Sequence, residues 1–267
     1  MVRLRMVGFF VALTWPATAF AWGAEGHRII AHIAAHELTP AARASIEDLL
    51  GVDAETQMVV ASTWADEIRN QRRDTAPWHF VDIPIGTTGY DARRDCPREN
   101  CVVAQIERDE RILAERSLLP AVRLEALRFL IHFIGDVHQP LHAANNMDRG
   151  GNEFRVVLGR RETNMHSVWD QDVLRVLGRN GENIALRIES EIAQTDSRPW
   201  QFGTAADWAN ESFRIASQEI YSDKSAVRTA APVILPREYL AIEENIVKTQ
   251  LEKAGLRLAW VLNRALH

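Results

Sequence analysis

The sequence has 267 residues, and its 31 Lys and Arg against 36 Asp and Glu give a formal charge of −5. A protein that holds nucleic acid through side-chain charge normally carries a basic face, so this balance argues against broad phosphate binding by lysine and arginine. No glycine-, serine- or proline-rich linker divides the chain, and no repeat or low-complexity tract occurs in it. We therefore expect one domain.

The first residues have the pattern of a secretory signal peptide. Arg3 and Arg5 precede the apolar stretch 6–15, and the small residues Ala19 and Ala21 predict cleavage after Ala21. We expect residues 1–21 to be removed and residues 22–267 to form the mature protein, secreted or periplasmic. The apolar stretch is shorter than the roughly 20 residues that span a bilayer, so we expect no membrane association.

Cleavage would delete two arginines and no acidic residue, which leaves 29 Lys and Arg against 36 Asp and Glu, a charge near −7. Any attraction for phosphate must then come from a source outside this count, such as bound metal ions.

Most of the mature chain has helical periodicity, and Thr39 followed by Pro40 provides an N-cap and a favourable first helical position. The segment 154–158, followed by a turn at 159–161, is the best candidate for β structure. We predict a mainly α, single-domain helical bundle with a small β-hairpin. The helices are expected at 26–38, 40–51, 59–69, 102–115, 121–136, from about His166, and at 182–192, 205–219 and 237–266.

Cys96 and Cys101 are the only cysteines, with four residues between them in a loop segment. An exported protein can oxidise such a pair, so a local disulfide is predicted. Metal binding by the two thiols is the competing interpretation, and the lack of a neighbouring histidine weighs against it.

The strongest chemical signal is a repeated spacing of histidine and aspartate. His132 and Asp136 are four residues apart, as are His166 and Asp170, so each pair would project from one face of a helix. Pro140 ends the first of these helices and allows His142 to turn toward the same space. A single pair of this kind would more often be a hydrogen bond or an ion pair.

Two such pairs favour metal binding. His132 and Asp136 lie in an otherwise apolar helix, where an imidazole and a carboxylate would cost several kcal/mol to bury without a compensating cation. Imidazole and carboxylate ligands without cysteine suit zinc in an exported hydrolase.

Several motifs together resemble the zinc-dependent single-strand nucleases of the S1/P1 type. The resemblance runs from about Trp22 to Asp170, with a further match near residue 210, and the last fifty residues match only as amphipathic helix. The motifs are Trp22 at the processed terminus, His27, Trp64-Ala65-Asp66, Trp78 to Asp82, His132 to His142, Asp148 to Asn152, Asn164 to Asp170 and Trp208 to Ser212.

The resemblance implies three zinc ions around one cleft. One would be held by Asp66, His79, His132 and Asp136. A second would be held by Asp136, by His27 and by the amine and carbonyl of Trp22. The third would be held by His142, His166 and Asp170. Three Zn²⁺ against three carboxylates leave about three positive charges, which would attract phosphate to an acidic protein.

The same resemblance assigns roles to the residues around the metals. Asp66 would also help to orient the attacking water, and Arg69 and Asn152 would contact the phosphate. Phe80 and Asp82 would form a base site, with an aromatic face for stacking and a carboxylate for the base edge. Each has an ordinary alternative: Arg69 as a solvated helix residue, Asn152 in the Gly150-Gly151 turn, Phe80 in the core and Asp82 in a loop.

The implied activity is that of a catalytic domain, residues 22–267, which hydrolyses single-stranded DNA and RNA to 5′-phosphorylated products and acts on 3′-mononucleotides as a 3′-nucleotidase. We expect a monomer of bacterial origin, since one cysteine pair and one glycosylation sequon are fewer than eukaryotic members carry. Two alternatives remain open, a zinc-dependent phospholipase C and a zinc- or nucleic-acid-binding protein without turnover. The phospholipases typically have Glu where this chain has Asp170.

Three further histidines are interpreted conservatively. His32 and His36 are one helical turn apart and could bind a metal, but surface or hydrogen-bonded histidines are the more common case. His138 is expected to orient a metal ligand by hydrogen bonding.

Overall fold

The computed structural model describes residues 22–193, 200–222 and 231–267, and the predicted signal peptide lies outside these ranges. The described chain is mainly helical with one small sheet, as the sequence predicts. Its α-helices are α1 (Ala24–His36), α2 (Pro40–Leu50), α3 (Ala54–Ala61), α4 (Trp64–Ile68), α5 (Ala92–Asp95), α6 (Val102–Ala114), α7 (Pro120–Val137), α8 (Met165–Ser167), α9 (Leu174–Leu177), α10 (Gly181–Ile192), α11 (Ala205–Ile215) and α12 (Tyr239–Ala265).

Shorter helical turns connect these helices. Three are 3-10 helices, η1 (Arg73–His79), η2 (Pro97–Glu99) and η3 (Pro140–His142), and two are π-helical turns, η4 (Val168–Asp172) and η6 (Ala216–Ile220). η3 begins at Pro140, two residues after the C-cap of α7, because proline cannot continue the helix.

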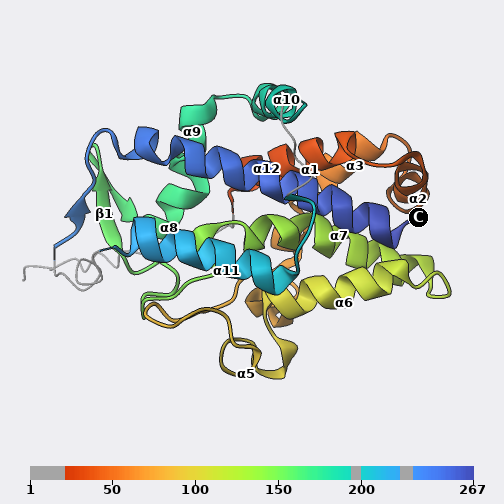
Figure 1. Ribbon diagram of the computed structural model, residues 1–267, viewed down its shortest axis with the longest axis horizontal. Helices are drawn as coiled ribbons and strands as arrows, with labels where there is room; N and C mark the ends of the chain where they lie inside the picture. Colours follow the sequence, from red (N-terminus) through yellow and green to blue (C-terminus); the bar gives the residue numbers. More distant parts are fainter. Residues whose placement is uncertain (1–21, 194–199, 223–230) are drawn as a thin grey trace, which may run out of the picture.

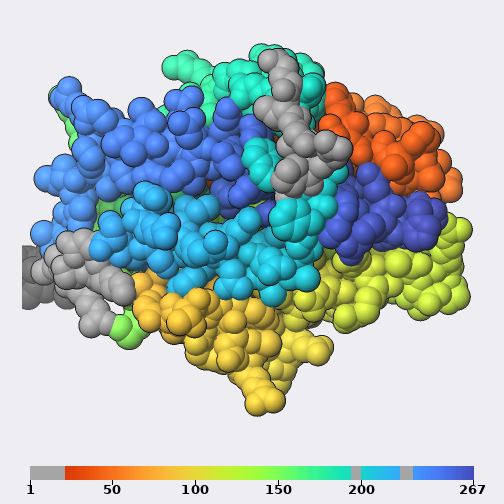
Figure 2. Space-filling view, viewed as in Figure 1, coloured from red at the N-terminus to blue at the C-terminus, as the bar shows by residue number. Residues whose placement is uncertain are grey.

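The long helices lie side by side along the longest axis of the molecule (Figure 1). α6 packs along α7, and α12 packs against both α1 and α7. In Figure 2 the blue surfaces of α11 and α12 cross the middle of this face, between the red to orange helices α1–α3 and the yellow segment that contains α5. α7 is the most buried of the long helices over its second half, where every residue from Phe129 to Val137 is inaccessible to solvent.

The helix predicted over 59–69 is interrupted. α3 ends at Ala61 and α4 begins at Trp64, because Ser62 turns its hydroxyl back to the carbonyl of Val59 (2.7 Å). Such a bond competes with the regular helix pattern, and no proline or glycine marks the position in the sequence. The interruption leaves the carbonyl of Ser62 available to Nδ1 of His132, 2.7 Å away.

The predicted hairpin is present, with β1 (Arg155–Leu158) antiparallel to β2 (Arg161–Asn164) and Val156 opposite Thr163. A third strand, β3 (Val233–Ile234), adds to β1 in parallel and gives the order β2-β1-β3. β3 was not predicted from the sequence, because two residues are too few for a periodic signal. In the described parts of the chain, no helix is both long and apolar enough to cross a membrane.

A charged network is buried between α7, α11 and α12. Arg257 is 2% exposed and donates to Glu211 (2.7 Å) and to the carbonyl of Trp200 (3.1 Å). Its Nη1 also lies 2.9 Å from Nε2 of His138, while Nδ1 of His138 faces the carbonyl of Ile134 (2.6 Å). Burial and the neighbouring guanidinium hold the pKa of His138 well below its usual range, so the ring is neutral. The network ties the C-terminal helix to the end of α7.

We predict that Arg257→Met lowers the free energy of unfolding by about 3 kcal/mol, because it leaves Glu211 with only the longer contact to Lys253 (3.5 Å) and leaves Nε2 of His138 without its partner. The matched control is Arg264→Met, in the same helix, where an exposed arginine pairs with Glu110 and stacks on Trp260. The control should cost less than about 1 kcal/mol. Chemical denaturation measures both, and equal losses would show that the buried network is not the stabilising element.

Candidate metal centre

Four side chains predicted as ligands of one ion converge on a single point. Nδ1 of His79 lies 3.0 Å from Oδ2 of Asp136 and 3.1 Å from Nε2 of His132. Nε2 of His132 is 3.3 Å from the same Asp136 oxygen, and Oδ1 of Asp66 is 3.8 Å from both ring nitrogens. All four residues are buried. They come from α4, the end of η1 and the last turns of α7.

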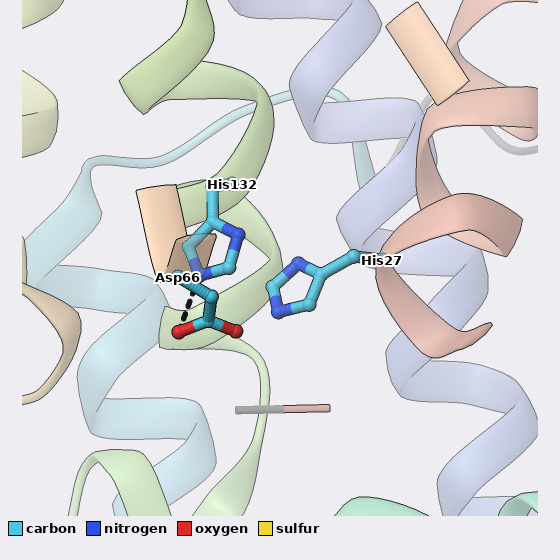
Figure 3. A group of neighbouring side chains, drawn as sticks. All are labelled: His27, Asp66 and His132. Carbon is cyan, nitrogen blue, oxygen red and sulfur yellow. Dashed lines mark ion pairs between the residues drawn. The ribbon is translucent and has the colours of Figure 1, made fainter. Parts of the chain in front are cut away.

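His27 approaches the same carboxylate from α1, with its Nε2 3.4 Å from Oδ1 of Asp136. Its ring stacks on that of His132, with centroids 3.9 Å apart. Figure 3 shows these two rings and Asp66 directed into one space. The contact depends on Gly135, because a Cβ there would lie 2.7 Å from Nδ1 of His27. Glycine therefore allows α1 and α7 to approach closely enough for both oxygens of Asp136 to face histidines.

A third group contains His142, His166 and Asp170. Nε2 of His166 lies 3.3 Å from Oδ2 of Asp170, and the rings of His142 and His166 stack with centroids 5.0 Å apart. The ligand atoms of the three residues lie within 4.8 Å of one another. Each of these groups brings together the side chains that the sequence analysis assigned to one ion, and the ligand roles themselves stay a prediction.

Three of the histidines are oriented by backbone carbonyls. In each, Nδ1 faces a carbonyl oxygen and thereby directs Nε2 into the cluster, as ligating histidines commonly do. These contacts run from His132 to Ser62 (2.7 Å), from His142 to His79 (2.7 Å) and from His166 to Gly150 (2.6 Å). The last depends on the turn at Gly150, whose φ of +61° favours glycine and where a Cβ would lie 2.6 Å from the Leu141 carbonyl oxygen.

The donor set fits a divalent metal. Several buried ring nitrogens and carboxylate oxygens in these groups have no hydrogen-bond partner within the protein, which would cost about 1–3 kcal/mol for each neutral group and more for a charged one. The atoms are Nδ1 and Nε2 of His27, Oδ1 of Asp66, Nε2 of His79, Oδ1 of Asp136 and Nε2 of His142. Nitrogen and carboxylate oxygen are ligands that zinc prefers.

The electrostatics of the protein alone are unbalanced in a way that cations would correct. Burial lowers the pKa of His27, His79 and His166, and lowers that of His142 to about 3, so these imidazoles are neutral. Neutral imidazole is the form that binds a metal. Burial, with Asp136 and Asp66 nearby, raises the pKa of Asp170 well above its usual range.

His132 is different, because its two carboxylate neighbours outweigh burial. Burial alone would lower its pKa, but Asp136 and Asp66 raise it to about 9 in the protein without metal. In return, His132 and the other histidines hold the pKa of Asp136 well below its usual value despite complete burial. Asp136 is therefore an anion, and each of its two oxygens needs a positive charge or a hydrogen-bond donor beside it.

Arg69 lies beside this centre, one turn after Asp66. Its Nη1 is 3.8 Å from Oδ1 of Asp66, and its charge acts on the pKa of both His166 and Asp170. Its side chain is 28% exposed. Arg69 is therefore partly accessible to solvent and lies close enough to the first and third groups to influence both.

The other residues predicted to contact substrate lie in loops. Phe80 is half-buried, and its carbonyl accepts from the amide of Val102 (3.0 Å). Asp82 is exposed and accepts a hydrogen bond from the side chain of Asn145. Asn152 donates its Nδ2 to the carbonyl of Arg149 (2.8 Å), which is the local turn role considered as its alternative.

The predicted disulfide between Cys96 and Cys101 is present. It closes the loop that leads into α6, and Cys101 immediately precedes Val102, the partner of Phe80. The bridge therefore supports the segment that carries Phe80.

The start of the described chain packs against the third group. Trp22 is completely buried, and the amide of the next residue, Gly23, donates to the carbonyl of Asp170 (2.7 Å). α1 then begins at Ala24 and places His27 in the centre one turn later. The amino-terminal residues are thus fixed to the segment that holds Asp170.

Two neighbouring residues differ from the sequence-based expectation. His138 does not orient a ligand, since both of its ring nitrogens belong to the network with Ile134 and Arg257. The neighbouring Gln139 does so instead, because its Nε2 donates to Oδ1 of Asp170 (2.6 Å) while its Oε1 accepts from Leu141. The only signal in the sequence for this role of Gln139 was its position directly before Pro140, after the helix that carries His132 and Asp136.

Comparison with known proteins shows the family of the chain. The family model described as S1/P1 Nuclease matches residues 22–267. Endonuclease 4 of Arabidopsis thaliana is 32% identical over 273 residues, which cover 92% of this chain and 89% of the relative. Nuclease S1 of Aspergillus oryzae is 28% identical, with 90% of each chain covered. Nuclease P1 of Penicillium citrinum is also 28% identical, over 90% of this chain and 96% of the relative. The chain belongs to the S1/P1 nuclease family.

Proposed function

We propose that this chain is a secreted, zinc-dependent phosphodiesterase that hydrolyses single-stranded DNA and RNA to 5′-phosphorylated products and acts as a 3′-nucleotidase. Membership in a nuclease family supports hydrolysis of phosphodiester bonds in nucleic acid. The observation that carries the zinc dependence is the set of buried nitrogen and oxygen atoms that converge without a protein partner. The match beginning at Trp22 is consistent with a mature chain that starts there.

Three ions account for the three groups. Asp66, His79, His132 and Asp136 would hold the first, His27 with Asp136 and the Trp22 terminus the second, and His142, His166 and Asp170 the third. Zinc in such positions acts as a Lewis acid on phosphate and makes water nucleophilic near neutral pH.

The protein residues would bind and orient the substrate. Asp66 has an oxygen without a hydrogen-bond partner, which can accept a hydrogen bond from the attacking water. Arg69 lies next to it with its side chain partly exposed, where its guanidinium can contact a phosphate oxygen. Asn152 would need only to exchange its bond to Arg149 for one to phosphate.

The preference for single strands would follow from the burial of the centre. All nine predicted ligands are buried, so a phosphodiester can reach them only if the neighbouring base is turned away from its partner strand. Phe80 and Asp82 would receive that base by stacking and by hydrogen bonding.

Hydrolysis of single-stranded DNA, single-stranded RNA, duplex DNA and a 3′-mononucleotide by the processed protein tests the proposal. We expect cleavage of both single strands and the mononucleotide, with duplex DNA cut at least about tenfold more slowly, since unpairing a base costs a few kcal/mol. Phosphatidylcholine should be left intact. Zinc-loaded protein that cleaves only the lipid would indicate the phospholipase alternative, and protein inert on every substrate would indicate a binding function.

The variant Asp136→Asn should lose zinc and activity together. The amide cannot supply two anionic oxygens to the ions on both sides, so we expect a fall in kcat/KM of about 100-fold or more. Elemental analysis and single-strand hydrolysis measure the two effects on one sample. Asp109→Asn changes a buried aspartate on α6 that pairs with Arg108 and should retain both zinc and activity.

An added residue before Trp22 tests the role of the amino terminus. Retaining the leader or adding a tag converts the α-amine into an amide, which cannot bind zinc as an amine does. We expect the loss of about one zinc per chain and of most activity. Removing the extension with a protease that leaves Trp22 first should restore both. Full turnover by the extended protein, shown intact by mass spectrometry, would refute the assignment.

The variant Gly135→Ala tests the approach of His27 to Asp136. The new methyl group would occupy the position of the His27 ring, so the second ion should be lost while the third is retained. Val137→Ala removes core packing from the same helix and serves as the control for destabilisation. We expect a zinc deficit only in Gly135→Ala, and an equal zinc content in the two variants would contradict the geometry.

A further inference from the structure

Outside the metal centre, a second cluster of imidazoles and carboxylates joins three helices. It contains His32 and His36 on α1, Glu55 at the start of α3 and Glu189 on α10. Figure 1 shows α3 and α10 next to α1, and the packing of both against α1 agrees with this view. His36 follows His27 by nine residues, two and a half helical turns, so it projects from the opposite side of α1. The cluster is therefore separate from the nuclease centre.

Each glutamate contacts both histidines. Glu189 lies 3.1 Å from Nδ1 of His32 and 2.8 Å from Nδ1 of His36. Glu55 lies 3.1 Å from Nε2 of His32 and 3.0 Å from Nε2 of His36. The four side chains form a closed ring in which both Nδ1 atoms face one carboxylate and both Nε2 atoms face the other.

This ring has too few hydrogen-bond donors when both imidazoles are neutral. A neutral imidazole has one N–H donor and one acceptor nitrogen, so two rings supply two donors for four contacts with carboxylate oxygens. If both Nδ1–H groups donate to Glu189, the lone pairs of both Nε2 atoms face the oxygens of Glu55. Acceptors at 3.0–3.1 Å repel one another unless a cation lies between them or both rings carry two protons.

Burial distinguishes the roles of the two carboxylates. The side chain of Glu189 is 14% exposed and that of His32 is 11% exposed, whereas Glu55 and His36 are each 36% exposed. Glu189 is therefore placed to fix the orientation of both rings, as a carboxylate behind a ligating histidine does. Glu55 lies on the open side, where an ion can enter from solvent.

We propose that His32, His36 and Glu55 bind a divalent cation of the zinc class and that Glu189 orients the two imidazoles. Zinc–ligand bonds of about 2.0–2.2 Å place ligand atoms roughly 3.3 Å apart in a tetrahedron. The Nε2 atoms of His32 and His36 lie 3.1 and 3.0 Å from oxygens of Glu55, which is close to this spacing. Water would complete the coordination. The ion would link α1, which also carries His27, to α3 and α10, and its role is structural.

Zinc stoichiometry measured by native mass spectrometry, on intact processed protein equilibrated with Zn²⁺ alone, tests the site. His36→Gln should bind one zinc fewer per chain than the wild type, and Glu55→Gln, which changes an equally exposed residue on another helix, should do the same. The control His267→Gln changes an exposed histidine far along the chain and should match the wild type. Added Zn²⁺ should also raise the melting temperature of wild type and control more than that of either variant.

The alternative is a ring of ion pairs without metal. It predicts equal zinc counts in wild type, His36→Gln and Glu55→Gln, and that result would overturn the proposal even if both variants were less stable. Single-strand hydrolysis by the same samples separates this inference from the proposed function, because none of the four residues contacts the nuclease centre. If the wild type is inert on nucleic acid but His36→Gln binds one zinc fewer than the wild type, this site is upheld and the proposed function is rejected.

Discussion

Asp136 is a carboxylate with no solvent exposure whose two oxygens face different histidines, and the rest of the molecule is arranged around it. Burying such an anion costs several kcal/mol unless positive charge compensates it, and among its imidazole neighbours only His132 has a raised pKa, of about 9. The helices that meet here, α1, α4 and α7, thus bring together groups that are only partly compensated by one another in the protein alone. The zinc ions that we propose would convert this cost into a stabilising interaction between elements distant in sequence.

The surrounding fold holds these groups in position by backbone contacts more than by side chains. The break between α3 and α4 presents the Ser62 carbonyl to His132, and the turn at Gly150 presents another to His166. Gly135 permits the contact between α1 and α7, and Gln139 directs Asp170. The buried pair of Arg257 and Glu211 fixes α12 to α11 beside this region. Small departures from regular helix therefore have a direct part in positioning the predicted ligands.

Much of this arrangement could be predicted from the sequence because its signals are local. The spacing of His132 and Asp136 follows the helical repeat, and Thr39 before Pro40 marks the start of α2. The misassigned His138 and the unrecognised Gln139 are adjacent residues on opposite sides of one turn, a distinction that depends on how α12 packs. The break at Ser62 and the two-residue strand β3 depend on tertiary contacts in the same way.

Anomalous scattering at the zinc absorption edge, from crystals of the protein beginning at Trp22, would show whether the buried groups around Asp136 are metal ligands. We expect three peaks in this region: between Asp136 and Asp66 with His79 and His132, between Asp136 and His27, and among His142, His166 and Asp170. Water or direct hydrogen bonds in these places, in fully active protein without zinc, would contradict these ligand roles.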